Sequence, residues 1–114
     1  MKKENRLKKR KEFAYIFKKG ESYGSKNLVL VISKSKLPKF KVGFSVSKKV
    51  GVAVIRNKVK RRLKEAVYFY RKNIKNGFNM IFVAKQSLKD QKYVDVLSEV
   101  ESLLRKANLY QEEI

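Results

Sequence analysis

The sequence contains no cysteine and no histidine among its 114 residues. Without cysteine there is no disulfide framework, no thiolate zinc site and no cysteine nucleophile. Phosphodiester hydrolysis normally uses clustered carboxylates that hold metal ions, or a His or Lys placed for proton transfer. The absence of histidine removes one of these possibilities before any motif is considered.

Long apolar stretches are lacking as well. No segment approaches the roughly 20 consecutive apolar residues of a membrane-spanning helix. The polar, lysine-rich N-terminus lacks the apolar segment of a secretory signal. We therefore expect a cytoplasmic protein with no membrane partner.

Acidic residues are scarce, with 10 Asp and Glu against 30 Lys and Arg and a formal charge of +20. Solubility does not require so large an excess, so a polyanionic partner is expected, and nucleic acid ranks first. Asp95 and Glu99 lie one helical turn apart and could share a cation, although such pairs usually form a polar helix face. We expect no catalytic residue, no protein-bound metal or cofactor, and no small-molecule substrate.

A chain of this length with 43% hydrophobic residues fits one domain with one modest core. Residues 1–8 are almost wholly charged or polar, and we expect them to form a basic, flexible N-terminal arm. Residues 9–114 are expected to form the single folded domain.

Hydrophobic periodicity predicts the order helix, strands, helix, strand, helix. The strands over residues 28–32 and 40–46 are expected to form a hairpin-like pair. Gly20 is expected to cap the first helix in a left-handed conformation, and Gly77 to stop the second helix. A short extended segment near residues 22–24 is possible. These patterns predict an α/β (α+β) two-layer sandwich with one central mixed sheet and about three helices. The expected helices cover 9–19, 55–74 and 93–107, and the strands 28–32, 40–46 and 78–84.

The densest basic signal extends over residues 47–66, where a strand end leads into the polar face of the long helix. On that face only Glu65 offsets the repulsion among Lys60, Arg61, Lys64 and Arg71, which favours a bound polyanion over a merely solvated face. Helical N–H groups add partial positive charge for a phosphate. The predicted phosphate contacts are Lys48, Lys49, Arg56, Asn57, Lys58, Lys60, Arg61, Arg62 and Lys64, with Arg62 close to the apolar stripe.

The motif Arg56-Asn57-Lys58, followed by Lys60-Arg61-Arg62, resembles the arginine–asparagine motif of the bacterial ribonuclease P protein. The segments RLKKRKEFAYIFKKG, FKVGFSVSKKVG and MIFVAK resemble its first helix, the strand before the motif and its last strand. The resemblance implies a left-handed crossover between parallel strands, an exception to the usual hand. It also implies a single RNA-binding domain that partners a catalytic RNA subunit. The assembled particle would remove the 5′ leader of precursor tRNA with magnesium.

The resemblance also bears on two pairs of side chains. Phe13 and Phe17 have the spacing of core residues, but they match the helix that would face the leader and could stack on unpaired nucleotides. Ser45 and Ser47 occupy the polar side of a strand, where they could contact sugar or phosphate or could be ordinary surface serines. Both interpretations stay open for each pair.

Three positions depart from the family pattern. Val52 stands where asparagine is common, Lys58 replaces the second arginine of the motif, and Val31 occupies a strand position where the family carries an aromatic residue. Lys58 keeps the charge but lacks the planar fork of arginine. The alternatives are a ribosomal or general RNA-binding protein of similar fold, or a DNA-compacting protein that would bind duplexes broadly.

Overall fold

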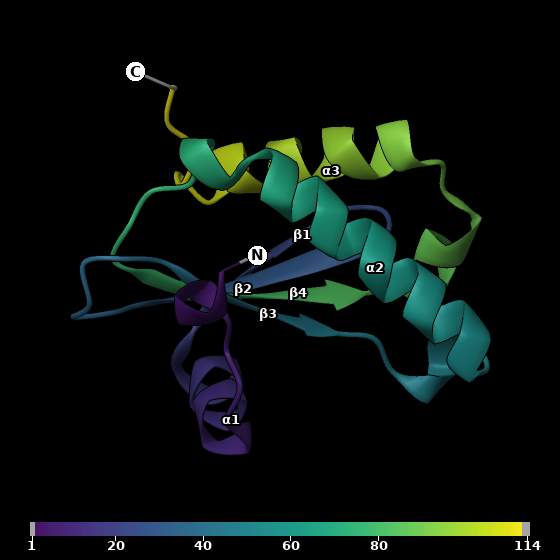
Figure 1. Ribbon diagram of the computed structural model, residues 1–114, viewed down its shortest axis with the longest axis horizontal. Coiled ribbons are helices and arrows are strands. Elements are labelled where there is room, and N and C mark those ends of the chain that lie inside the picture. The colour runs from purple at the N-terminus through teal and green to yellow at the C-terminus, as the bar shows by residue number, and fades with distance from the viewer. Residues whose placement is uncertain (1, 113–114) are drawn as a thin grey trace.

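The computed structural model describes residues 2–112. A four-stranded sheet carries α2 and α3 on one face and α1 on the other (Figure 1). No helix in this described part of the chain combines the length and apolarity needed to cross a bilayer. The predicted fold class, with one mixed sheet and three helices, is confirmed. The elements are α1 (Arg10–Lys19), β1 (Glu21–Gly24), β2 (Leu28–Lys34), β3 (Lys41–Ser45), α2 (Ala53–Phe69), β4 (Phe78–Ala84) and α3 (Tyr93–Lys106).

The order of the strands is β1-β2-β4-β3, with β4 antiparallel to β2 and parallel to β3. The prediction that β2 and β3 form a hairpin-like pair is therefore wrong, because β4 lies between them. Met80, Ile81 and Phe82 in β4 are buried on both faces of the sheet, whereas Lys41 and Ser45 at the ends of β3 are only half-buried. A strand that is apolar on both faces belongs at the centre of a sheet.

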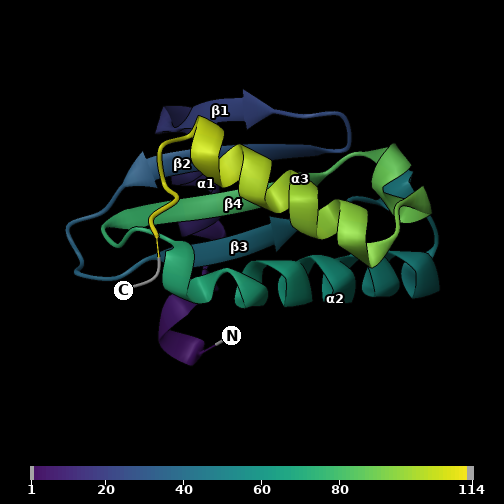
Figure 2. The same cartoon turned by 90° about the horizontal axis from the view of Figure 1, so that it is seen from above.

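The parallel strands β3 and β4 are joined through α2. Seen from the side of α2 and α3 (Figure 2), both strands run from left to right, α2 returns in front of the sheet, and β4 lies above β3. This path has a left-handed sense, which is the rare hand for such a connection. The expectation that came from the family resemblance is met.

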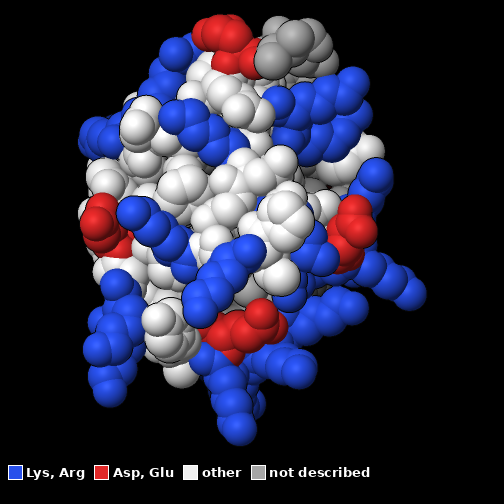
Figure 3. Space-filling view, turned by 90° about the vertical axis from the view of Figure 1, so that its left-hand side faces the viewer, with Lys and Arg blue, Asp and Glu red and all other residues white. Residues whose placement is uncertain are grey.

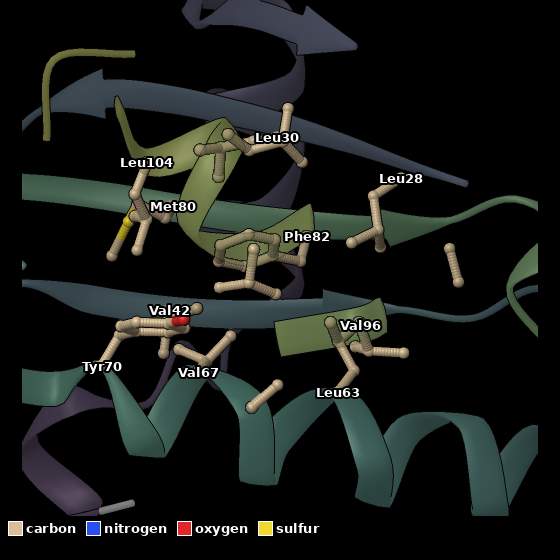
Figure 4. Close-up of a cluster of buried hydrophobic side chains, with 14 of the residues drawn as sticks. Leu28, Leu30, Val42, Leu63, Val67, Tyr70, Met80, Phe82, Val96 and Leu104 are labelled. Carbon is tan, nitrogen blue, oxygen red and sulfur yellow. The ribbon is translucent and has the colours of Figure 1, made fainter. Parts of the chain in front are cut away.

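The face under α2 and α3 holds most of the hydrophobic core. Alternate residues of β2 and β4, including Leu30 and Phe82, point toward Leu63 of α2 and Leu104 of α3 (Figure 4). All four side chains are fully buried. This face is where the apolar stripes of the two long helices meet the sheet.

The opposite face has a smaller core under α1, formed by Leu7, Ile16, Val31 and Ile81. Gly20 follows α1 with φ −79° and ψ 166°, so the predicted left-handed cap is wrong. A Cβ at Gly20 would lie 2.5 Å from the carbonyl oxygen of Ile16 and 2.6 Å from that of Ile32. The glycine is needed because α1 and β2 approach each other closely there, not because of its φ angle.

The long helix is shorter than its apolar pattern predicts. α2 ends at Phe69, and a 3-10 turn over Arg71–Asn73 follows. Ile74 remains buried without being helical, because it forms an isolated bridge with Tyr110. Gly77 has φ 88° and directly precedes β4. It therefore allows the turn that leads into β4 and is not the stop signal of α2.

The segment before α1 runs along the outer edge of β3. Asn5 Nδ2 donates to the carbonyl oxygen of Phe40 at 2.7 Å, and the N–H of Leu7 donates to that of Val42 at 3.1 Å. Arg6 forms a parallel bridge with Val42, and Leu7 is 7% exposed. Flexibility of residues 1–8 stays a prediction; the structure places Asn5 to Leu7 against the sheet.

Candidate nucleic-acid interface

The two phenylalanines of α1 lie one helical turn apart on the same side of the helix. Phe13 is half-buried and packs on the small core, with its ring directly over Gly43. Phe17 is 48% exposed. The structure thus gives Phe13 a packing role and leaves about half of the Phe17 side chain exposed.

A pocket at the β3 edge joins α1, the N-terminal segment and α2. It has a volume of about 150 Å³, and Phe13 and Gly43 form part of its apolar wall. Arg6, Lys60 and Lys64 bring three cations to the same space. An apolar floor with cations at its rim suits a nucleotide, whose base is apolar on its faces and whose phosphate is anionic.

The pKa of Lys64 reflects the positive charge gathered in this pocket. Partial burial, with further contributions from Lys60 and Arg6 nearby, lowers the pKa of the Lys64 ammonium from its ordinary value. Each of these causes disfavours the charged form. In the free protein, the three cations repel one another. A phosphate bound between them would attract all three, so the pocket favours a polyanion.

The arginine–asparagine segment, Arg56-Asn57-Lys58, lies in the first turns of α2, on the N-terminal side of Lys64. Asn57 and Lys58 are exposed, whereas Arg56 is half-buried. The Nε of Arg56 is buried with no hydrogen-bond partner in the described residues.

Arg61 and Arg62 of α2 line one open hollow of about 360 Å³, together with Lys58 and with Tyr93 of α3. Arg61 is exposed. Arg62 is half-buried, and its Nη1 donates to the carbonyl oxygen of Gln91 at 2.6 Å. This bond ties α2 to the segment before α3. An RNA contact by Arg62 stays a prediction.

The remaining predicted residues lie where β3 leads toward α2. Ser45 is half-buried and pairs in register with Val83, on the sheet face that α1 partly covers. Ser47, Lys48 and Lys49 are exposed in the short turn that follows. In the chain they lie between β3 and the start of α2.

Cations are not confined to α2. Figure 3 shows the face on the left of Figure 1, where Lys and Arg surround an area of uncharged residues and Asp and Glu form a few separate patches. At α2 and the β3 edge, cations lie together with aromatic rings around common hollows. Charge alone does not define the site.

The acidic residues of the described part of the chain do not form a metal site. Within residues 2–112, no three His, Cys, Asp or Glu side chains lie close enough together to hold an ion. Glu99, considered above with Asp95, instead accepts hydrogen bonds from the hydroxyl of Ser25 and from both the backbone and side-chain nitrogens of Asn27. Its carboxylate fixes the connection between β1 and β2.

Sequence reasoning missed Arg6 and the aromatic residues near the end of α2. Arg6 was included in the flexible arm, and only its pairing with β3, far along the chain, brings it to Lys60 and Lys64. Phe69 interrupts the apolar spacing of α2, and this break in periodicity was the available signal.

Comparisons with known proteins agree with this geometry. The family model described as Ribonuclease P matches residues 1–108. A ribonuclease P protein component from Clostridium botulinum (strain 657 / Type Ba4) is 44% identical over 112 residues, which is 95% of this chain and 98% of the relative. A Staphylococcus aureus RNase P protein mutant superposes with a TM-score of 0.88 at 34% identity, covering 95% of this chain and 92% of that one. The RNase P protein from Thermotoga maritima gives 0.82 at 28% identity, covering 89% and 96%.

Proposed function

This chain belongs to the ribonuclease P protein family, and from that premise we propose that it holds the 5′ leader of precursor tRNA for a catalytic RNA subunit. The family makes it the protein component of an endoribonuclease complex that processes tRNA. Leader binding and the division of labour with RNA are our proposal. The ribosomal and DNA-compacting alternatives receive no support from the family match.

The observation that carries the proposal is the pocket at the β3 edge. Phe13 from α1 and Lys60 and Lys64 from α2 meet there, although they are distant in sequence. The exposed ring of Phe17 continues the aromatic side of α1 beside this pocket. An unpaired strand could place bases on the rings and phosphates on the lysines.

The start of α2 has a separate role in the proposal. The half-buried Arg56 and the exposed Asn57 and Lys58 would contact the catalytic RNA. Such contacts to phosphate fix register and orientation without reading sequence. The leader and the catalytic RNA would then be held by different parts of one small domain.

Bond breaking is assigned to the RNA side. The described residues hold no carboxylate cluster that fits a metal ion, so no step of the proposal runs through a metal on this chain. We propose that magnesium ions act on the RNA of the assembled particle. The chain's own contribution is to bind and position RNA, which raises the rate by orienting the reacting groups.

The test is cleavage of precursor tRNA by the cognate catalytic RNA at low magnesium, with and without this chain. Substrates with a very short leader and with a longer leader are compared. We expect the chain to enhance cleavage, and more strongly for the longer leader. Absence of enhancement at every leader length would sink the proposal.

A further inference from the structure

The end of α2 carries exposed aromatic side chains that the leader-binding proposal does not use. Phe69 is 60% exposed, Tyr68 is 43% exposed, and Tyr93 at the start of α3 is 37% exposed. Together with Lys64, Glu65 and Arg71 they line an open hollow of about 500 Å³. Isolated exposed apolar residues need no explanation, but three rings around one hollow do.

The Tyr68 ring is held in place. The Arg71 guanidinium lies over it, 4.1 Å from the ring centre, and Nη1 of Arg71 donates to the Tyr68 carbonyl oxygen at 3.0 Å. A cation–π contact covers one face of the ring and leaves the rest of it accessible. Tyr68 is thus an ordered platform with a positive charge attached to it.

Phe69 is supported from beneath in a similar way. Its ring meets that of Tyr70 edge to face, with centroids 5.0 Å apart and planes at 89°. Tyr70 is buried, and its hydroxyl donates to Glu101 of α3 at 3.2 Å. The buried ring fixes the position of the exposed one, so that Phe69 presents apolar surface to solvent at little further entropic cost.

We propose that Tyr68, Phe69 and Tyr93, with Lys64 and Arg71, form a second RNA-binding surface that takes unpaired nucleotides by stacking. Stacking on rings is tolerant of sequence, because every base has an aromatic face, and adjacent cations hold the backbone. This surface, the α2-end platform, goes beyond leader binding by α1. It would stand even if the leader were bound elsewhere.

Charge favours RNA over a second copy of this chain as the occupant. Lys64 and Arg71 border the rings, Glu65 is the one acidic residue lining the hollow, and the chain carries a net charge of +20. Two such surfaces would repel each other unless a polyanion lay between them. A polyanion with apolar bases satisfies both the cations and the rings.

The platform is also within reach of RNA held at the start of α2. Asn57 and Phe69 are separated by twelve helical steps, or roughly 18 Å along the axis at ~1.5 Å per residue. One bound RNA could contact both ends of the helix. Lys64 borders both the β3-edge pocket and the platform, which makes the basic surface continuous between them.

The experiment measures binding of the full chain to a labelled single-stranded oligoadenylate, with Tyr68→Ser/Phe69→Ser as the test variant. We expect the affinity to fall roughly tenfold, the loss typical of removing one or two stacking rings. Tyr68→Phe keeps the ring and should bind as the parent does. Leu37→Ser is the control, because it removes a side chain that is 44% exposed, as Tyr68 is at 43%, from the connection between β2 and β3, and it should bind as the parent does.

Phe69→Leu guards against a folding artefact, since it keeps apolar contact with Tyr70 while removing the ring. It should unfold at the parental temperature and still bind oligoadenylate more weakly. Equal affinities of the parent, the double variant and Phe69→Leu would overturn the proposal. So would a parent that self-associates in sedimentation while the double variant stays monomeric, which would mark a protein interface.

The readout separates this proposal from leader binding. Loss of the α2-end platform should weaken binding of precursor tRNA equally for short and long leaders. A leader-length effect caused by Phe17→Ala tests the other proposal alone. Failure of either one leaves the result for the other intact.

Discussion

The two faces of the sheet differ in how completely they are covered. Beneath α2 and α3, side chains from β2, β3 and β4 join one large buried cluster, and the half-buried Tyr23 of β1 packs against it. On the face of α1, only Leu7, Ile16, Val31 and Ile81 are fully packed, and Val29 and Val83 remain half-buried. One face supplies stability, and the incomplete cover of the other leaves room for a partner.

The unequal cover follows from element length. α1 has 10 residues, whereas α2 and α3 have 17 and 14. A helix of ten residues spans about 15 Å, whereas the 17 residues of α2 span about 26 Å at ~1.5 Å per residue. The ends of β3 and β4 beyond α1 are thus left without a helix over them.

The largest effect should come from breaking the large core. Phe82→Ala removes a fully buried ring that stacks near Phe44 and should lower the free energy of unfolding by about 3–5 kcal/mol. Val83→Ala, one position along on the opposite face, should cost about 1 kcal/mol, because Val83 is half-buried. Urea unfolding followed by circular dichroism measures both. Equal costs would contradict the contrast between the faces.

A smaller effect is expected from crowding the face of α1. The Cβ of Gly43→Ala would collide with the ring of Phe13, and β3 cannot move away because it is paired with β4. Displacing the ring should destabilise the fold by about 1–3 kcal/mol. It should also weaken binding of leader-bearing RNA.

Gly24→Ala is the control for this substitution. Gly24 also lies in a strand, but no atom comes within 4 Å of the position of its Cβ. Its melting temperature and RNA affinity should match those of the parent. If Gly43→Ala behaved in the same way, Phe13 would not be held by its contact with the sheet.

Phe17 tests whether the uncovered face binds RNA. Phe17→Ala should reduce affinity for precursor tRNA by about 1–2 kcal/mol, the contribution of one stacked base, with a smaller loss for mature tRNA. Tyr15→Ala removes a more exposed ring from another side of α1 and should leave both affinities unchanged. Filter binding with the two RNAs gives the comparison. Equal losses for both RNAs would point to a folding effect of the Phe17 substitution.

The sequence predicted the elements better than their arrangement. Hydrophobic periodicity located α1, α2 and α3 and the three longest strands, because it reflects burial within one element. It did not show that β4 separates β2 from β3, since pairing depends on contacts between distant segments. The pairing of Arg6 with β3 and the hydrogen bond from Arg62 to Gln91 could not be predicted for the same reason, because each joins segments that are distant in sequence.

The candidate site was partly predictable for a related reason. The cations of α2 form a local cluster in sequence, so their common face could be read from helical spacing. Their meeting with Phe13 required the tertiary fold. Gly20 is instructive in another way: its place after a helix suggested a cap, but the structure needs it for a close approach between α1 and β2.

The smallest effect concerns Lys64, which lies on the helix of the stable face but lines the pocket of the binding face. Its pKa is lowered in the folded chain, so its charged form disfavours folding. That cost is fully present below the folded pKa and disappears as the pH rises to the ordinary value of 10.5. At neutral pH, Lys64→Gln should therefore melt at a slightly higher temperature, by up to about 2 °C.

The same substitution should weaken RNA binding, because a phosphate contact is lost while the repulsion is relieved. The slope of log affinity against log salt should become shallower by roughly one unit. Lys36→Gln, in the exposed connection between β2 and β3, is the charge-matched control and should change neither property as much. A stability gain that persisted above the ordinary lysine pKa would show that packing, and not charge, is the cause. If Lys64→Gln raised the melting temperature and lowered the RNA affinity, one side chain would link the stability of the fold to RNA binding.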